Sequence, residues 1–157
     1  MDKKQSENIV KIAAAVLFVA AVAAAGALLT DTASDWYEAL VKPAFQPPDL
    51  VFPIVWTVLY AMIALSLVRL IGTGRLNMGL LALFAANGLL NVLWSYVFFR
   101  MQSPMVAFAV IVAIGVTAVL LIREAWKTDA AAGWLLVPYL VWLAFAAILN
   151  YVIAMLN

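Results

Sequence analysis

Two residue types are absent from this chain of 157 residues, which contains neither cysteine nor histidine. Their absence excludes disulfides, the usual zinc ligands, histidine-ligated haem, thiol nucleophiles and histidine bases. Charge is also scarce: charged residues make up 11% of the chain, and the net charge of +1 offers no basic surface for nucleic acid. We therefore expect no bound metal, no required cofactor and no nucleic-acid partner.

Apolar residues are correspondingly abundant, at 68% of the chain against roughly half in a soluble domain. A membrane-spanning helix needs about 20 predominantly apolar residues, and suitable runs recur along the sequence. They are Ile12–Leu29, Val51–Ile71, Met78–Phe99, Pro104–Ile122 and Ala130–Leu156. We predict an all-α membrane protein in which residues 1–157 form a single domain, a bundle of five transmembrane helices.

The first run is open to a second interpretation, because Lys3, Lys4 and Lys11 precede it as they would in a signal peptide. Its apolar stretch is longer than the roughly 7–15 residues of a signal peptide. We therefore expect an uncleaved helix.

Basic residues predict the orientation, because they gather in cytoplasmic loops. Of the nine lysines and arginines, all but Lys42 and Arg100 lie in the amino-terminal tail or around the second and fourth loops. In a bacterial cell membrane, where we expect the protein to lie, this distribution predicts an amino terminus in the cytoplasm and a carboxyl terminus outside.

The connection between the first two runs, Thr30–Leu50, is much longer than the other three. Loops beyond about 12–15 residues are usually functional or disordered, and the aromatic residues and prolines of this one are unsuited to disorder. We predict that it folds as a cap over the outer end of the bundle. The short connections predict that the helices they join pack as antiparallel neighbours.

Three of the predicted helices carry aromatic and amide residues at helical spacing on one face. These stripes are Trp56 and Tyr60; Asn87, Asn91, Trp94 and Phe98; and Trp142, Ala146, Leu149 and Asn150. Because successive helices run in opposite directions, all three stripes meet at the end of the bundle beneath the first loop. The sequence therefore predicts a lidded aromatic pocket there.

Simpler interpretations exist for the same residues. Tryptophans anchor helices at the bilayer interface, which is our interpretation of Trp126 and Trp134, and asparagines in lipid hydrogen-bond neighbouring helices. Both interpretations stay open for Trp56, Trp94 and the asparagines, whereas anchoring explains the deeper Trp142 poorly. No carboxylate lies within a predicted span, so a proton relay or cation path has no residues to use.

Three blocks of sequence stand out. The first runs from Trp36 to Pro48 and on through Phe52-Pro53 to Tyr60, the second is Asn91-Val92-Leu93-Trp94-Ser95 with Phe98-Phe99, and the third runs from Pro138 to Asn150. In order and spacing they resemble the TspO/MBR family of tryptophan-rich sensory proteins. Phe45 departs from the pattern, because the family often has tryptophan there.

The resemblance implies a homodimer of five-helix bundles, each with a ligand cavity closed by the first loop. It also implies binding of porphyrins, such as protoporphyrin IX and haem, and of similar flat hydrophobic molecules. Carried over by motif, the ligand-binding residues are Tyr37, Pro47, Trp56, Tyr60, Asn91, Trp94, Phe98, Trp142, Ala146, Leu149 and Asn150. Indole faces would stack on a flat macrocycle, and amides would bond its polar substituents.

We therefore expect a membrane receptor or sensor linked to tetrapyrrole regulation or oxidative stress. A transporter of porphyrin or another hydrophobic ligand is one alternative. A second alternative is light-dependent degradation of bound porphyrin, with Trp56 and Trp142 as oxidisable partners. The last alternative is a purely structural membrane protein. The chain has no acid/base set for ordinary catalysis, and the sequence leaves enzymatic activity open.

Overall fold

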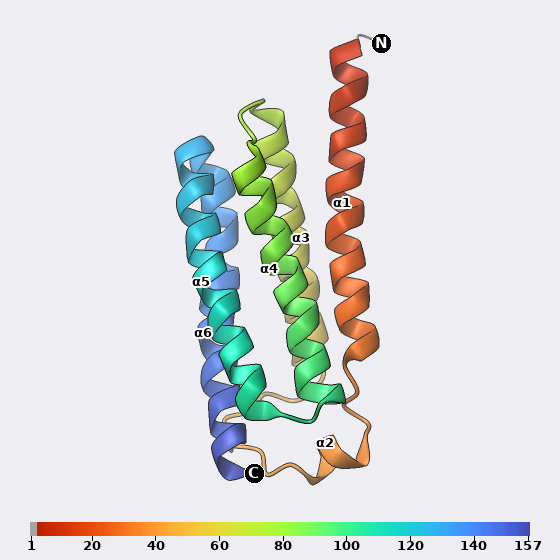
Figure 1. Cartoon of the computed structure of the whole chain (residues 1–157), viewed down its shortest axis with the longest axis vertical. Coiled ribbons are helices and arrows are strands. Elements are labelled where there is room, and N and C mark those ends of the chain that lie inside the picture. The colour runs from red at the N-terminus through yellow and green to blue at the C-terminus, as the bar shows by residue number, and fades with distance from the viewer. Residues whose placement is uncertain (1–2) are drawn as a thin grey trace.

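The computed structural model describes residues 3–157, and this part of the chain is helical apart from its connections (Figure 1). The elements are α1 (Lys3–Leu29), α2 (Asp35–Ala39), α3 (Val51–Gly72), α4 (Met78–Ser95), the π-helix η1 (Tyr96–Arg100), α5 (Pro104–Thr128) and α6 (Ala130–Leu156). Residues 1–2 of the predicted domain, and the side chains of Lys3 and Lys4, lie outside the described residues.

Within residues 3–157, five helical segments are long and apolar enough to cross a membrane, with α4 and η1 forming one of them. The predicted class, an all-α membrane protein of five spans, is therefore confirmed. Two helices are longer than their apolar runs: α1 begins at Lys3, and α5 continues to Thr128. The reason is that hydropathy marks only the length in contact with lipid, whereas helical hydrogen bonding continues into the polar region.

Local sequence explains where the helices begin. Asn77 caps α4 by accepting a hydrogen bond from the Leu80 amide at 2.9 Å, and Ser34 accepts one from the Tyr37 amide at the start of α2. Pro104 starts α5, at a position where its missing N–H costs no helical hydrogen bond.

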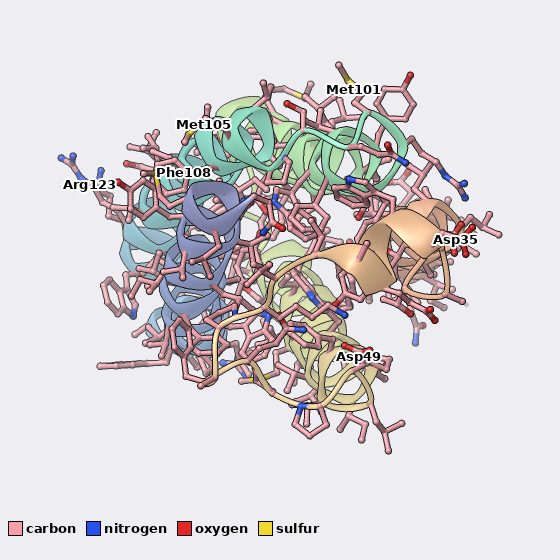
Figure 2. All side chains as sticks on the ribbon, turned by 90° about the horizontal axis from the view of Figure 1, so that it is seen from below. Asp35, Asp49, Met101, Met105, Phe108 and Arg123 are labelled. Carbon is pink, nitrogen blue, oxygen red and sulfur yellow. The ribbon has the colours of Figure 1, made fainter. Side chains whose placement is uncertain are left out.

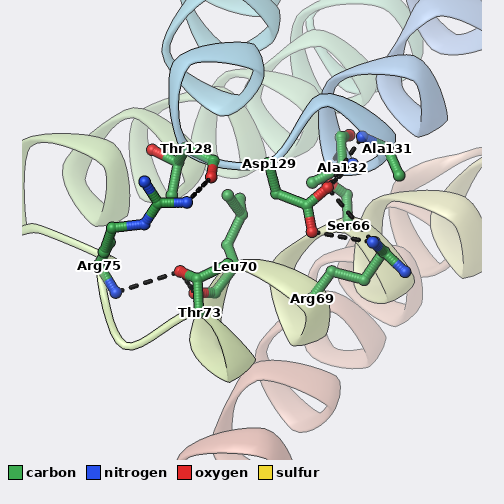
Figure 3. Close-up of polar contacts among 9 residues, drawn as sticks. All are labelled: Ser66, Arg69, Leu70, Thr73, Arg75, Thr128, Asp129, Ala131 and Ala132. Carbon is green, nitrogen blue, oxygen red and sulfur yellow. Dashed lines mark hydrogen bonds and ion pairs between the residues drawn. The ribbon is translucent and has the colours of Figure 1, made fainter.

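Asp129 separates α5 from α6 and caps the second of them (Figure 3). Its carboxylate accepts hydrogen bonds from the amides of Ala131 and Ala132 and forms an ion pair with Arg69 of α3 at 2.9 Å. Desolvation acts to raise the pKa of Asp129, but the two amides and the guanidinium outweigh it and lower that pKa. Nearby, the Ser66 hydroxyl donates to the Ala132 carbonyl at 2.9 Å, so α3 and α6 are joined at this end of the bundle.

The helices do not pack simply in chain order. The pairs α4–α5 and α5–α6 pack closely as their short connections predict, but α3 packs against α6, and α1 packs against both α3 and α4. The expectation that α3 and α4 are close neighbours is wrong, because they make few contacts with each other. Each of them therefore packs mainly against other helices, α3 against α1 and α6, and α4 against α1 and α5.

Gly88 determines how closely α1 approaches α4. A Cβ atom at this position would lie 3.0 Å from Val22 Cγ2 and 3.1 Å from Phe18 Cζ, closer than ordinary van der Waals contact. Small residues at such crossings let transmembrane helices pack backbone to backbone.

Gly88→Val should therefore loosen α1 from the bundle and destabilise the fold by about 1–3 kcal/mol, the usual cost of overpacking. Gly115→Val in α5 is the matched control, because the described residues leave a Cβ there without a neighbour within 4 Å. Thermal unfolding in detergent would show a lower Tm for the first variant only. Equal melting temperatures for the two variants would contradict this account of the α1–α4 contact.

Candidate functional site

A cavity of about 380 Å³ lies between the helices, at the end of the bundle where the segment 30–50 crosses. Its volume falls within the roughly 300–1,000 Å³ of small-molecule sites. The following predicted ligand-binding residues line it: Tyr37, Trp56, Tyr60, Asn91, Trp94, Phe98, Trp142, Ala146, Leu149 and Asn150. Pro47 is the predicted residue that lies outside the lining. That the lining residues bind a ligand stays a prediction.

Aromatic rings from three spans dominate the wall. Trp94 and Phe98 stack, with ring centroids 5.2 Å apart and planes inclined by 23°. From α3, Trp56 packs against Tyr60 with a centroid separation of 5.3 Å. From α6, Trp142 lies 5.9 Å from the Phe52 ring in an edge-to-face contact. The cavity is therefore bounded by ring faces and edges, which suit a flat apolar ligand.

A hydrogen-bonded network lies at the inner end of the cavity. Tyr139 of α6, which is 1% exposed, donates its hydroxyl proton to Asn87 Oδ1 at 2.8 Å and accepts a hydrogen bond from Asn91 Nδ2 at 2.7 Å. Asn87 Nδ2 donates to the Thr117 hydroxyl of α5 at 2.8 Å. These contacts tie α4 to α5 and α6.

Asn150 forms a second junction of the same three spans, nearer the first loop. Its Oδ1 accepts a hydrogen bond from Trp94 Nε1 at 2.9 Å, and its Nδ2 donates to the Pro104 carbonyl at the start of α5, at 2.8 Å. Asn87 and Asn150 thus hydrogen-bond neighbouring helices, which was one of the two interpretations left open by the sequence. Asn150 and Asn91 also line the cavity, so for these two the interpretations do not exclude each other.

Two buried polar atoms of the lining have no hydrogen-bond partner among residues 3–157: the indole Nε1 of Trp142 and the amide Oε1 of Gln46. Leaving such a group unpaired costs about 1–3 kcal/mol. The site therefore offers one donor and one acceptor to a ligand. Residues 3–157 contain no group of three or more acidic side chains that could hold a metal ion.

The segment 30–50 crosses the end of the bundle, as the view from below shows between Asp35 and Asp49 (Figure 2). Its centre is Tyr37 of α2, which is 6% exposed. The Tyr37 hydroxyl donates to Asp49 Oδ1 at 3.2 Å and accepts from Gln46 Nε2 at 3.3 Å, and Lys42 Nζ lies 3.8 Å above the ring centroid. Burial, followed by the charge of Asp49, raises the pKa of Tyr37 to about 12.

Contacts with the helices hold this segment at both sides. At one side, the Asn157 side chain pairs with the backbone of Val41, accepting from its N–H at 2.9 Å and donating to its carbonyl at 3.1 Å. At the other, Arg100 forms an ion pair with Asp31 at 3.6 Å. The segment is therefore attached to the ends of α6 and η1 as well as to α1 and α3.

Sequence reasoning missed the contribution of α1 to the cavity wall. Ala23, Gly26, Ala27 and Thr30 all line the cavity. Their spacing of three, four and seven residues places them on one helix face, so the pattern was present. Small residues suit close helix packing, and in the structure they also leave room for the cavity.

Phe99 was missed for a different reason. On a regular helix it would point away from the face of Phe98, but Val97, Phe98 and Phe99 are all buried in η1. The wider turn, in which the Met101 amide bonds to the Tyr96 carbonyl five residues back at 3.0 Å, brings both phenylalanines to the cavity. Such π-turns are frequent at functional sites. No residue pattern in this stretch predicts one.

Comparison with known proteins agrees with this architecture. The family model described as the TspO/MBR family matches residues 14–156. "Tryptophan-rich protein TspO" of Chlorobaculum tepidum is 39% identical over 157 residues, covering 97% of this chain and 99% of that protein. "Tryptophan-rich sensory protein" of Cereibacter sphaeroides is 37% identical, covering 90% of this chain and 91% of that protein. "Translocator protein" of Ovis aries is 33% identical, covering 74% of this chain and 71% of that protein.

The five apolar spans define an integral membrane protein, and the cavity beneath the segment 30–50 is lined by aromatic residues. The chain belongs to the TspO/MBR family. The resemblance seen in the three sequence blocks is thereby confirmed, because the matched region contains all of them.

The first loop should loosen at high pH through Tyr37. A group whose pKa is raised on folding stabilises the folded form below its unfolded pKa of about 10. That contribution is lost as the pH rises through the folded value of about 12. The phenolate then cannot donate to Asp49 and lies against a carboxylate.

A spin label at the exposed residue Ala39, introduced as the only cysteine of the chain, would report this change. Label mobility should increase above about pH 10. Tyr37→Phe should give a more mobile label at neutral pH and a smaller further increase at high pH, because the phenylalanine ring has no proton to lose. An identical increase in both proteins would contradict the role given to the phenol.

Proposed function

We propose that the protein is a membrane receptor or sensor that binds porphyrins, such as protoporphyrin IX and haem, and similar flat hydrophobic ligands in this cavity. The proposed role is in tetrapyrrole regulation or the response to oxidative stress. The observation that carries the proposal is an aromatic cavity in which a buried N–H and a buried carbonyl oxygen, those of Trp142 and Gln46, lack protein partners.

The chemistry of a porphyrin matches these features. Its macrocycle is flat and apolar, so the ring faces of Trp94 and Phe98 on one side and Trp56 on the other suit it. Its carboxylates are acceptors for the Trp142 N–H. Because the chain has neither histidine nor cysteine, the proposed binding uses stacking and hydrogen bonds instead of strong iron ligation.

Light-dependent porphyrin degradation is a second candidate, and one observation favours it. Trp56 and Trp142 both line the cavity, and Trp56 is in contact with the oxidisable rings of Tyr60 and Tyr139. A bound porphyrin would supply light absorption, and dissolved oxygen would be the oxidant. The names of the relatives include both "sensory" and "translocator" proteins, so transport of the same ligand is a third candidate.

We also propose that the protein lies in a bacterial cell membrane, with its amino terminus in the cytoplasm and the cavity towards the outside. Relatives from bacteria such as Chlorobaculum tepidum support the host, and the distribution of basic residues supports the orientation. In this orientation the loop 30–50 lies at the external face.

Ala146→Phe tests the proposed binding site. Ala146 lies one turn after Trp142 and lines the cavity, so a phenyl ring there should fill the space of the ligand and weaken protoporphyrin IX binding about tenfold, or about 1.4 kcal/mol. Ala144→Phe is the matched control, because Ala144 is exposed and lies outside the lining. Titration with protoporphyrin IX, followed by tryptophan quenching, would measure both. Equal affinities in the two folded variants would refute the proposed site.

The photochemical candidate has its own test. Replacing Trp56 and Trp142 together by Phe retains much of the apolar surface and removes the two oxidisable indoles. Under light and oxygen, loss of the porphyrin absorbance should slow at least about tenfold in the double variant if these residues carry the reaction. Loss at the full rate, measured at equal porphyrin occupancy, would exclude them.

A further inference from the structure

A second cavity, of about 610 Å³, lies at the opposite end of the bundle. Its walls come from α1, the last turns of α3, the connection to α4 and the first turns of α4. They are mostly apolar, with Asn8, Lys11 and Gly74 as the exceptions; the apolar lining residues are Ala14, Ala15, Phe18, Leu67, Ile71, Leu76, Leu81, Phe84 and Ala85.

The α1–α4 contact at Gly88 closes this cavity on its deep side. Phe18 and Val22 pack directly against Gly88, and beyond this point the space between α1 and α4 widens towards the amino-terminal end of α1 (Figure 1). From Phe18 to Lys11 the lining follows α1 for seven residues, a length of about 10 Å at 1.5 Å per residue. The cavity is therefore an apolar slot that is deep in the membrane at Phe18 and polar at its mouth.

The mouth carries positive charge. Lys11 is exposed and forms no ion pair with a side chain that the structure describes; Glu7, one turn earlier on the same helix, is not within ion-pair distance. Arg75 follows Gly74 at the rim, and its guanidinium donates to the Thr128 carbonyl without meeting a carboxylate. Asp129, which follows Thr128, is already paired with Arg69.

We propose that this slot holds one acyl chain of an anionic membrane phospholipid whose phosphate group pairs with Lys11. An apolar slot that opens into a bilayer cannot be filled favourably by water, whereas an acyl chain matches both its depth and its lining. Lys11 at the mouth lies where a phosphate group would be, and a basic side chain near anionic lipid contributes about 1 kcal/mol. The site would therefore distinguish anionic from zwitterionic lipid.

Native mass spectrometry of the full chain, delipidated in detergent, tests the proposal. Phosphatidylglycerol and phosphatidylcholine with identical acyl chains would be added separately, and the lipid-bound fraction measured. Phosphatidylglycerol should be retained about fivefold more strongly, the factor that ~1 kcal/mol gives. Lys11→Gln should remove this preference, whereas Arg123→Gln, a matched change at an exposed residue of α5 outside the lining, should keep it.

A second pair of variants tests the slot itself. Ala85→Trp should fill it and reduce retention of both lipids, and Ala86→Trp, at the next and exposed position outside the lining, should not. Unfolding temperatures would confirm that both variants are folded. A preference unchanged in Lys11→Gln, or equal retention in Ala85→Trp and the native protein, would overturn the proposal. A third outcome would also overturn it: the native protein forms dimers without lipid, and Ala85→Trp dissociates them. That result would mean that a second copy of the chain covers the slot.

Discussion

Inside a bilayer no water is available to polar side chains, so every amide or hydroxyl in a span needs a partner within the protein. This constraint organises the structure. Asn87 and Asn91 of α4 meet Tyr139 of α6, and Asn150 of α6 meets both Trp94 of α4 and the backbone at Pro104 of α5. These hydrogen bonds fix how α4 and α6 are rotated, since turning either helix would leave buried polar groups unpaired.

The cavity follows from that rotation. With the asparagines facing inwards, the aromatic residues one turn away on the same faces also point into the bundle, and α1 presents only small residues opposite them. At the other end of the bundle, α1, the last turns of α3 and the first turns of α4 leave the second cavity between them. Two cavities result, one at each end, separated where Gly88 lets α1 approach α4. Tryptophan side chains line only the cavity beneath the loop 30–50, whereas Phe18 and Phe84 are the aromatic residues of the other lining.

The sequence predicts the spans and most of the cavity wall, because both depend on patterns within single helices. Apolar runs locate the five spans, and spacing of three and four residues places Trp56, Tyr60, Trp142 and Ala146 correctly. Pro47 lies outside the cavity lining, because a motif in a loop says nothing about which side chains point inwards.

Other features depend on relations between helices and cannot be predicted from one helix at a time. Tyr139 is the centre of the polar network, but its role requires knowing which helix faces Asn87. The π-turn that brings Phe99 to the cavity has no sequence pattern of its own, and the weak contact between α3 and α4 contradicts the expectation from their short connection. The slot at Lys11 lies among residues of α1, α3 and α4, so its lining also depends on how these helices cross.

The central claim is that a flat ligand binds in the aromatic cavity beneath the first loop. The most direct test is an experimental structure of the protein with metal-free protoporphyrin IX bound. The account predicts one macrocycle per chain between Trp56 and Trp94, with a polar ligand atom within hydrogen-bond distance of Trp142 Nε1. A macrocycle bound on the lipid-facing surface or in the slot beside Lys11, with the aromatic cavity unchanged, would contradict it.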